Sequence, residues 1–171
     1  MEWSLKAASQ RAFEAQHLIG LLYYNGLGVS QNYQKAMEWF LKAADQGYAF
    51  SQFNIGTIHE IAKDYTNAIK WYLMAANQNH PSAQYNLGVL YFNGLGVVKD
   101  YQKGMGWYLK AANQGDADAQ NNLGSLYFNG DGVAKDKIKA KEWYKKAAEQ
   151  GHKTAKENLN KMDSWIHRLF N

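Results

Sequence analysis

One pair of residues has the types and the order that begin a metalloprotease helix. His59 and Glu60 match the first half of a His-Glu-x-x-His motif, in which two histidines bind zinc and the glutamate acts as general base. The position that needs the second histidine holds Lys63, and the chain has no cysteine to bind a metal as a thiolate. The other histidines show no ligand spacing and are expected to be solvated or to cap helices: His17, His80, His152 and His167. The sequence therefore predicts no metal site.

Three short glycine loops look at first like phosphate-binding loops. They are Gly26-Leu27-Gly28, Gly94-Leu95-Gly96 and Gly130-Asp131-Gly132. A P-loop needs a strand before it and a Lys-Ser/Thr pair after it, and none of the three has either. No Gly-x-Ser-x-Gly turn that would expose a nucleophilic serine occurs in the sequence. We therefore expect helix-to-helix turns here, in a protein that is not an enzyme and uses no cofactor.

The glycine loops end a string of residues that recurs along the chain. The segment 83–97 returns with few changes as 119–133 and as 15–29, and Gln120 follows Gln84 by 36 residues. A fixed period of this length indicates a solenoid of stacked units, each of which covers the apolar face of its neighbour. We predict one all-α repeat domain over residues 1–171. Its four full repeats are expected at residues 12–47, 48–79, 80–115 and 116–151.

Each repeat is predicted to be a pair of helices. In the first helix of the third repeat, Ala83, Leu87 and Leu90 form an apolar stripe at helical spacing. Gly88 lies inside that helix, where glycine costs about 1 kcal/mol relative to alanine. The same place holds Gly20, Gly56 and Gly124 in the other repeats. Such a recurring cost predicts that a neighbouring helix approaches closely at the glycine.

The second helix of each repeat is expected to begin at a capping side chain. Asp100 is a good N-cap because its carboxylate accepts backbone N–H bonds, and Asn32, Asp64 and Asp136 occupy the same place. The helix then runs to a pair of alanines. One tryptophan per second helix is predicted to be largely buried between helices: Trp39, Trp71, Trp107 and Trp143.

Three places depart from the regular repeat. Residues 1–11 match the end of a repeat, so they are expected to form a half repeat, its second helix. The second repeat is four residues short at the place of the glycine loop, which would change the local curvature or mark a docking site. Residues 152–171 are predicted to be a terminal capping helix, which needs only one apolar face. That face would consist of Ala155, Leu159, Met162, Ile166 and Leu169.

The repeated pattern identifies a family. Ala-x-x-Leu-Gly-x-x-Tyr-x-x-Gly-x-Gly-Val-x-x-Asp-x-x-Lys-Ala-x-x-Trp-x-x-Lys-Ala-Ala-x-x-Gly resembles the Sel1-like repeat, a relative of the tetratricopeptide repeat, over nearly the whole chain. Gly104 and Asn79 depart from it, at an alanine and a glycine place. The resemblance implies a right-handed α-superhelix whose first helices line a concave face. It also implies an adaptor in protein assembly, and bacterial members often take part in secretion, host contact or signalling.

Carried over from tetratricopeptide repeats, the concave places give the candidate partner-binding residues. They are Phe53, Tyr85, Tyr24, Phe92, Phe128, His17, Asn25, Asn93 and Asn129. Aromatic side chains of this kind are enriched in binding hot spots. Phe53 and Tyr85 are the stronger candidates, because the core pattern does not require them. For Tyr24, Phe92 and Phe128 the alternative is packing against the next repeat, and for the asparagines it is capping of their own helices.

The distribution of charge favours a protein partner over nucleic acid. The net charge is +4, but many lysines fall on second helices, whereas the first helices of the four repeats carry only acidic charges, among them Glu14, Glu60 and Asp118. Basic charge is thus expected outside a slightly acidic, aromatic groove, and nucleic acid would need a basic one. A protein or peptide with apolar and basic features fits better. Exposed end repeats would also allow weak self-association.

The predicted function is a protein–protein interaction scaffold, in a bacterial setting of secretion, effector or toxin neutralisation, or signalling. The alternative is an enzyme acting on cell-wall or β-lactam substrates, as has been linked to cysteine-rich family members, although this chain has none of their cysteines. No apolar run is long enough to span a bilayer. The compartment stays open between the cytoplasm and, if an upstream signal was removed, the periplasm or the exterior.

Overall fold

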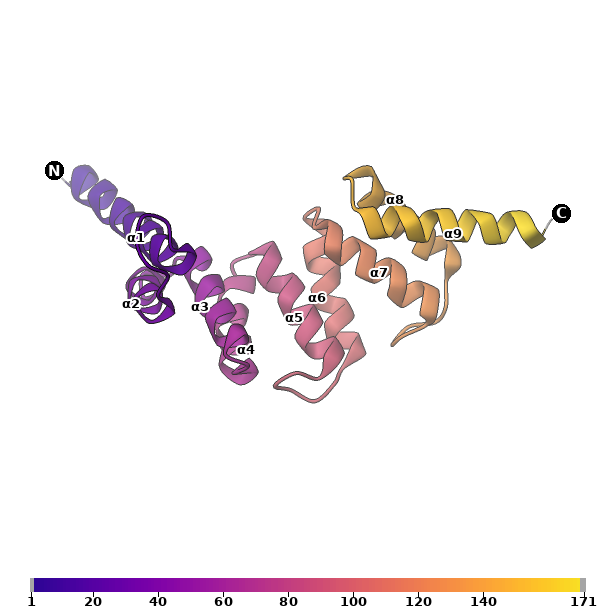
Figure 1. Ribbon diagram of the computed structural model, residues 1–171, viewed down its shortest axis with the longest axis horizontal. Coiled ribbons are helices and arrows are strands. Elements are labelled where there is room, and N and C mark those ends of the chain that lie inside the picture. The colour runs from indigo at the N-terminus through magenta and orange to yellow at the C-terminus, as the bar shows by residue number, and fades with distance from the viewer. Residues whose placement is uncertain (1, 170–171) are drawn as a thin grey trace. The chain divides into compact units, whose positions relative to one another are not determined.

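The computed structural model describes the backbone of residues 2–169 and the side chains of residues 12–163. Within these residues every regular element is an α-helix (Figure 1). The helices are α1 (Glu2–Asn25), α2 (Tyr33–Ala44), α3 (Ala49–Ile61), α4 (Tyr65–Ala76), α5 (Pro81–Asn93), α6 (Tyr101–Asn113), α7 (Ala117–Asn129), α8 (Lys137–Glu149) and α9 (Lys153–Leu169). The predicted all-α repeat architecture is confirmed.

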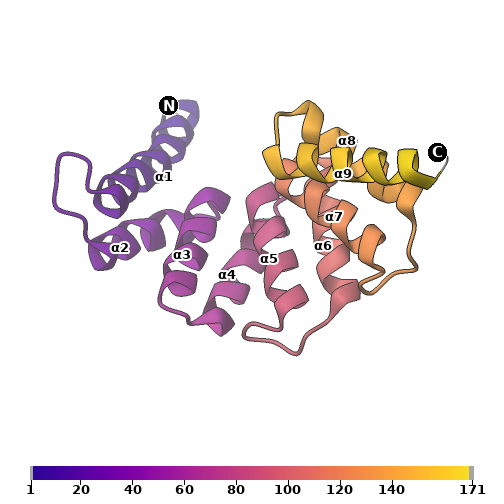
Figure 2. The ribbon, with the colours of Figure 1, turned by 45° about the vertical axis from the view of Figure 1, so that its right-hand side comes forward.

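The chain divides into two compact parts. The N-terminal part ends at Ala83 and the C-terminal part begins at Gln84. In the N-terminal part α1 packs on α2, α2 on α3, and α3 on α4. In the C-terminal part α6 packs on α7, α7 on α8, and α8 on α9 (Figure 2). Within each part, helical hairpins therefore stack on their sequence neighbours.

All four second helices begin at the predicted caps. The side chains of Asn32, Asp64, Asp100 and Asp136 each accept a hydrogen bond from the backbone N–H three residues later, at 2.9–3.3 Å. These bonds satisfy N–H groups that have no partner inside the helix. At Asp64, hydrogen bonds from the side chain and backbone of Asn67 lower the pKa of the carboxyl group.

The glycine inside each first helix makes room for an aromatic ring. A Cβ atom on Gly20, Gly56, Gly88 or Gly124 would lie 2.5–2.6 Å from a ring carbon of the paired second helix, closer than carbon atoms can approach. The rings that fill these spaces belong, in the same order, to Phe40, Tyr72, Tyr108 and Tyr144, and all four are buried. The close helix approach that the sequence predicts is thus present in every repeat.

The tryptophan beside each buried ring is not the core residue that the sequence suggested. All four tryptophans are partly exposed, because the next residue along the helix takes the place against the glycine. On three of them a lysine ammonium lies over the indole: Lys42 on Trp39 at 4.0 Å, Lys110 on Trp107 at 3.9 Å and Lys146 on Trp143 at 4.2 Å. These three tryptophans therefore form cation–π contacts near the surface.

Two kinds of turn join the helices of a hairpin. In the long turn of the third repeat, Gly94 and Gly96 have φ of 71° and 70°, a left-handed conformation that glycine adopts without strain. The short turn between α3 and α4 contains no glycine, and Lys63 takes φ of 59°. His59 spans it through a 3.2 Å contact between its Nδ1 and Oδ2 of Asp64. This turn is where the second repeat loses its four residues.

A pair of glutamines ties the two helices of each repeat together. The side-chain amide near the end of the second helix donates to the side-chain oxygen of a first-helix glutamine, at 2.7–3.0 Å. The pairs are Gln46 with Gln16, Gln78 with Gln52, Gln114 with Gln84, and Gln150 with Gln120. Gln52 and Gln120 also donate to carbonyls of the preceding repeat, those of Ala44 and Ala112. The buried amides of Gln52 and Gln120 thus link their repeats to the preceding ones.

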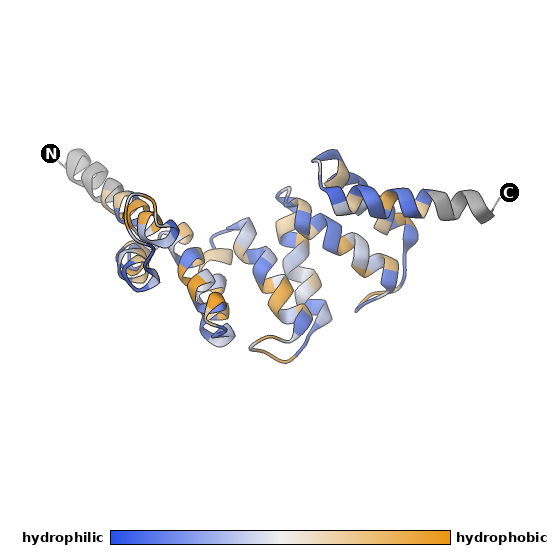
Figure 3. Ribbon diagram, viewed as in Figure 1, coloured by the Kyte–Doolittle hydropathy of each residue, from blue (hydrophilic) through white to orange (hydrophobic). Residues whose placement is uncertain are grey.

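The two ends of the described chain differ. Residues 2–11 are helical, as predicted, but α1 continues through them to Asn25 without the turn expected between a half repeat and the first repeat. The segment before residue 12 lacks the glycine that follows α2 at Gly47. At the other end α9 packs on α8 through buried Ala155 and Met162, while the first turns of α9 are otherwise mostly hydrophilic (Figure 3). Ile166 and Leu169 lie outside the residues whose side chains are described.

Candidate functional site: a pocket between α7, α8 and α9

In the N-terminal part, two of the predicted partner-binding residues pack internally. His17 is buried, its Nδ1 lies 2.9 Å from Oγ of Ser51, and burial lowers the pKa of its imidazole. Phe53 stacks on the imidazole of His80, with ring centroids 4.8 Å apart and planes 16° apart. Its ring also lies 5.7 Å from that of Tyr72. Both residues thus contribute to the packing between helices of this part.

Tyr24 and Asn25 make contacts at the end of α1. The ring of Tyr24 lies 5.3 Å from that of Tyr33, the first residue of the paired second helix. The amide of Asn25 donates to the carbonyl oxygen of Leu21 at 3.1 Å. For this asparagine the helix-capping alternative is therefore the observed arrangement. Asn93 repeats it at the end of α5, where its amide donates to the carbonyl of Val89 at 2.9 Å.

In the C-terminal part, four of the predicted residues meet around one pocket. Tyr85, Phe92, Asn93 and Asn129 line a hollow of about 460 Å³ on the first-helix side of α5 and α7. The ring of Tyr85 lies 5.8 Å from the buried ring of Tyr108. The two first helices α5 and α7 thus both contribute side chains to this hollow.

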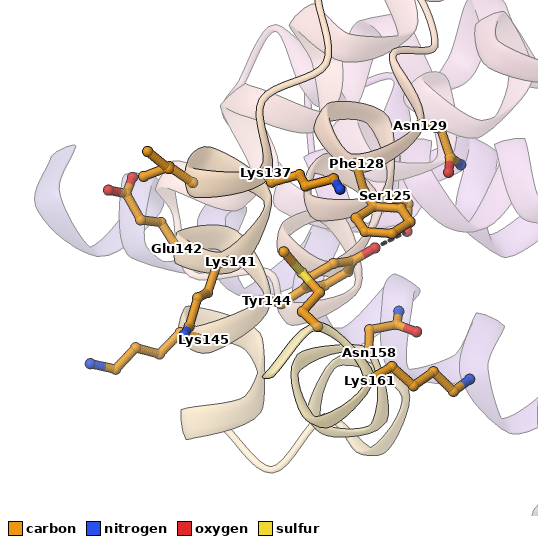
Figure 4. A pocket seen from close by; sticks show the side chains of 12 residues that line it. Ser125, Phe128, Asn129, Lys137, Lys141, Glu142, Tyr144, Lys145, Asn158 and Lys161 are labelled. Carbon is orange, nitrogen blue, oxygen red and sulfur yellow. Dashed lines mark hydrogen bonds between the residues drawn. The ribbon is translucent and has the colours of Figure 1, made fainter. Parts of the chain in front are cut away.

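A larger pocket adjoins it between α7, α8 and α9. Its volume is about 790 Å³, within the range of about 300–1,000 Å³ that is typical of ligand pockets. Phe128 and Asn129 line it together with Tyr144 from α8 and Met162 from α9 (Figure 4). Ser125 lines both pockets, and its hydroxyl oxygen lies 3.0 Å from that of Tyr144. Burial raises the pKa of the Tyr144 phenol.

Lysines occupy one face of α8 where earlier second helices are apolar. Lys137, Lys141 and Lys145 follow one another at four-residue spacing and all line the large pocket. The same three places hold Tyr-Met-Leu in α2 and α6 and Tyr-Ile-Leu in α4: Tyr33, Met37, Leu41; Tyr101, Met105, Leu109; Tyr65, Ile69, Leu73. Lysines of this second helix, expected on the outside of the solenoid, therefore line a hollow here. The four-residue spacing was the signal that could have identified them.

The change at Lys137 leaves Phe128 without the aromatic neighbour found in other repeats. Phe92 packs on Tyr101 with ring centroids 4.9 Å apart, and Tyr24 packs on Tyr33 in the same way. At the matching place in α8 the side chain of Lys137 extends toward Phe128 (Figure 4). Phe128 remains 40% exposed, at the edge of the pocket. This side chain is thus available to contact another molecule.

The charged residues that line the large pocket are mostly basic. Four lysines and one glutamate are among its lining residues, and in Figure 4 the carboxylate of Glu142 extends away from Phe128. Lys141 is paired with Asp163 of α9, with 2.6 Å between Nζ and Oδ1. Lys161 from α9 lies on the side of the pocket opposite Lys137. The pocket therefore combines an apolar floor with cationic groups on its rim.

Metal binding and membrane insertion find no support among the described residues. No group of three histidine, aspartate or glutamate side chains in that part of the chain is arranged to hold a metal ion. Of the zinc-motif residues, His59 contacts Asp64 and Glu60 accepts a hydrogen bond from the hydroxyl of Tyr72. Over the same described range, no helix has both the length and the apolar character needed to cross a membrane.

Comparison with solved structures finds close likenesses. The chain is similar to c5321, a protective antigen of uropathogenic Escherichia coli with an SLR fold, with 37% sequence identity and a TM-score of 0.86; the match covers 95% of this chain and 36% of that one. It is also similar to a Sel1 repeat protein from Oxalobacter formigenes, with 42% identity and a TM-score of 0.82, covering 89% and 62% of the two chains. In both cases the chain spans less than two thirds of the relative's length.

A third similar structure is the immunity protein Pa5087 from Pseudomonas aeruginosa. It shares 28% identity with this chain at a TM-score of 0.60, and the match covers 88% of this chain and 57% of that one. A comparison with curated proteins finds no matching sequence.

The family model of the Sel1 repeat matches four consecutive segments, residues 13–48, 49–80, 81–116 and 117–152. These segments correspond to the four helical hairpins, each with a glycine against a buried ring. Sequence and architecture agree, and the chain belongs to the Sel1 repeat family.

Proposed function

We propose that this Sel1 repeat protein binds a segment of another protein in the pocket between α7, α8 and α9. The observation that carries the proposal is the exposure of apolar side chains at the rim of a hollow. Phe128 is 40% exposed and Ile138 is 75% exposed, and both line the pocket. The place of Ile138 is polar in the other second helices, where it holds Gln34, Thr66 or Gln102. An apolar side chain gains stability at such a position only when something covers it.

The pocket has the character of a binding surface and not of a reaction centre. No histidine is among the described residues that line it. Its serine, Ser125, contacts the Tyr144 hydroxyl and the carbonyl of Asn121, and within the described part of the chain no base is positioned to activate it. The lining therefore favours binding over the alternative of a hydrolase acting on cell-wall or β-lactam substrates.

The comparisons support a protein partner. Sel1 repeats commonly serve as protein-interaction scaffolds, and one similar structure is an immunity protein of Pseudomonas aeruginosa. We extend the proposal to a bacterial role of that kind, in which the repeat surface holds and neutralises a partner protein. Secretion and signalling assemblies would use the same surface in the same way.

The test compares capture and affinity across variants of the whole chain. Tagged wild-type protein is used to capture partners, and the captured protein is then titrated into the double variant Phe128→Ala/Ile138→Ser by calorimetry. We expect a loss of affinity of roughly a thousandfold, since two apolar anchor residues that contribute about 2 kcal/mol each amount to nearly three factors of ten at about 1.4 kcal/mol per factor.

The matched control is Val98→Ser in the loop before α6. Val98 is apolar and 89% exposed but lines neither pocket. This variant should bind as the wild type does. If the control loses affinity and the double variant keeps it, the partner binds elsewhere and the proposal is wrong.

A further inference from the structure

The small pocket of about 460 Å³ and the large pocket of about 790 Å³ occupy the same place in successive repeats. Residues that line the small pocket have counterparts 36 positions later that line the large one. Three such pairs are Phe92 with Phe128, Tyr108 with Tyr144, and Asn122 with Asn158. A surface that recurs along a solenoid can hold a ligand whose own contacts recur at the same interval.

One helix, α7, separates the two pockets. Ser125 and Asn129 lie one turn apart on this helix, and both line the two pockets. A helix with its side chains is about 10 Å wide, so the centres of the pockets are about 10 Å apart. Each pocket is lined by a phenylalanine, Phe92 in the small one and Phe128 in the large one. A ligand that uses both pockets must therefore present two apolar side chains about 10 Å apart on one side of its backbone.

Asn129 supplies a polar group between the pockets. At the same place in the first and third repeats, the side-chain amides of Asn25 and Asn93 donate to a carbonyl of their own helix. Asn129 is exposed, and its side chain makes no hydrogen bond to the residues that the structure describes. Its amide therefore offers both a donor and an acceptor to the backbone of a bound segment.

The distance between the pockets and the amide on α7 together favour one backbone conformation. A polyproline II helix has three residues per turn and rises about 3.1 Å per residue, so side chains three residues apart lie on one side, about 9 Å from each other. A β-strand places the side chains of one face about 7 or 13 Å apart. Residues seven apart on an α-helix match the distance, but the backbone groups of that helix are paired internally. Those of polyproline II are free to bond with Asn129.

We propose that the bound segment is proline-rich, adopts the polyproline II conformation and crosses α7 with two apolar side chains three residues apart. The proposal rests on the proposed function and specifies the chemistry of its partner. One apolar side chain enters the large pocket beside Phe128, the other enters the small pocket beside Phe92, and Asn129 bonds to the backbone between them. Grooves lined by aromatic residues suit such segments, which are already ordered before they bind.

Designed peptides test the spacing. Three peptides share one composition, two leucines in an all-proline host, and differ only in whether the leucines are two, three or four residues apart. A fourth peptide is helical and alanine-rich, with its leucines seven residues apart. Fluorescence anisotropy measures the binding of each to the full chain. We expect the spacing of three to bind about tenfold or more tighter than the others, because only this peptide places both leucines in pockets.

Variants of the full chain locate the contacts. Phe92→Ala and Phe128→Ala should each weaken binding of the spacing-three peptide about tenfold or more. Asn129→Ala should weaken it about two- to tenfold, as expected for the loss of one hydrogen bond. The matched control is Asn25→Ala, which removes the same side chain at the same place in the first repeat but lines neither pocket, and should bind as the wild type does. Circular dichroism confirms that each variant is folded.

The outcomes separate this inference from the proposed function. If the three spacings bind equally, or if Asn129→Ala binds as Asn25→Ala does, the polyproline II segment is wrong, while dependence of the captured partner on Phe128 keeps the proposed function. Tightest binding by the helical peptide, with dependence on both phenylalanines, would replace the segment with a helix. If neither the designed peptides nor the captured partner depends on Phe128, both proposals are overturned.

Discussion

The buried tyrosines of α4 and α8 occupy the same place in their repeats but have different surroundings. The hydroxyl of Tyr72 donates to the carboxylate of Glu60 at 2.5 Å and lies 3.3 Å from Oγ1 of Thr57. The hydroxyl of Tyr144 meets only Ser125 among the corresponding residues, because Phe128 stands where Glu60 stands in the second repeat. The ring-on-glycine packing is the same in both. One residue at the rim determines whether the hairpin closes through a charged hydrogen bond or leaves an apolar opening.

The largest effect should come from removing the shared ring. Tyr72→Ala and Tyr144→Ala should each lower the free energy of unfolding by about 3–5 kcal/mol, as for other buried aromatic residues, with the smaller loss at Tyr144 beside the open pocket. Trp71→Ala and Trp143→Ala are the controls and should cost less, since both tryptophans are partly exposed. Urea unfolding measures all four. A larger loss for the tryptophans would mean that they, and not the tyrosines, hold the hairpins together.

Exchanging Glu60 and Phe128, the residues at the rim, tests directly whether they cause the difference between Tyr72 and Tyr144. Glu60→Phe removes the acceptor of the Tyr72 hydroxyl and should destabilise the chain by about 1–3 kcal/mol. Phe128→Glu supplies an acceptor near Tyr144 and should change stability by less than about 1 kcal/mol, while it weakens binding of the proposed partner by removing an apolar anchor. Urea unfolding and calorimetry provide the two measurements. Equal stability losses in both directions would show that the rim residue does not govern the difference.

The capping residues of α5 and α7, His80 and Asp116, should make contributions to folding stability that change with pH in opposite directions. The Nδ1 of His80 accepts the backbone N–H of Ala83, and burial lowers the pKa of the ring, so the folded state binds fewer protons than the unfolded state. Stability should fall as the pH drops through about 6.5, the unperturbed value for histidine, and His17 contributes in the same direction. At Asp116 burial raises the carboxyl pKa, so its contribution declines as the pH rises above the ordinary value of 3.8.

The variant His80→Asn keeps a side-chain acceptor at the cap but does not titrate. It should reduce the slope of unfolding free energy against pH between about pH 7 and 5.5, on either side of the ordinary histidine pKa, and Asp116→Asn should leave that slope unchanged. Chemical unfolding at a series of pH values measures both. A slope that His80→Asn does not alter would assign the pH dependence to other groups.

The smallest effect is expected at the ion pair between α8 and α9. Asp163→Asn breaks the contact with Lys141, whose place in α4 holds the buried Ile69. Both charged side chains are about half exposed, so the loss should be about 0.2–1 kcal/mol and should shrink as salt increases. Thermal unfolding at low and high salt is the measurement. A loss above about 2 kcal/mol, beyond the range of exposed ion pairs, would indicate that α9 depends on this pair more than on its apolar contacts.

The sequence predicted the repeat fold well because its strongest signals are local. The glycines, the caps and the apolar stripes each fix one step of backbone geometry, and all appear where the spacing placed them. The prediction that the tryptophan of each second helix is buried was wrong, because Trp71 and Tyr72 are adjacent large aromatic residues and only the tyrosine faces the glycine. Which ring is buried depends on which one meets the glycine of the partner helix. That contact joins residues far apart in the sequence, so local spacing does not reveal it.

The site was harder to predict because it depends on a departure from the repeat. The candidate residues came from places that recur, so they included Phe128 but neither the lysines of α8 nor Ile138. Sorting lysines by helix also concealed that three of them share one face. When the repeats are aligned position by position, α8 is the second helix in which places that are apolar elsewhere hold lysine. This comparison identifies the region from the sequence alone.

The paired glutamines have a consequence for how such chains can change in length. Gln120 bonds forward to Gln150 of its own repeat and back to the carbonyl of Ala112 in the repeat before it, and Gln52 does the same with Gln78 and Ala44. Duplication or loss of one whole repeat restores both bonds at the new junction, whichever residue of the repeat the change begins at. Loss of a segment that carries one of the paired glutamines would leave the other side-chain amide without its partner, at a cost of about 1–3 kcal/mol, whereas the turn between the helices can shorten without breaking either bond, as in the second repeat. Recombination in genes of this kind should therefore add or remove whole helical hairpins, while smaller changes in length are confined to the turns between helices.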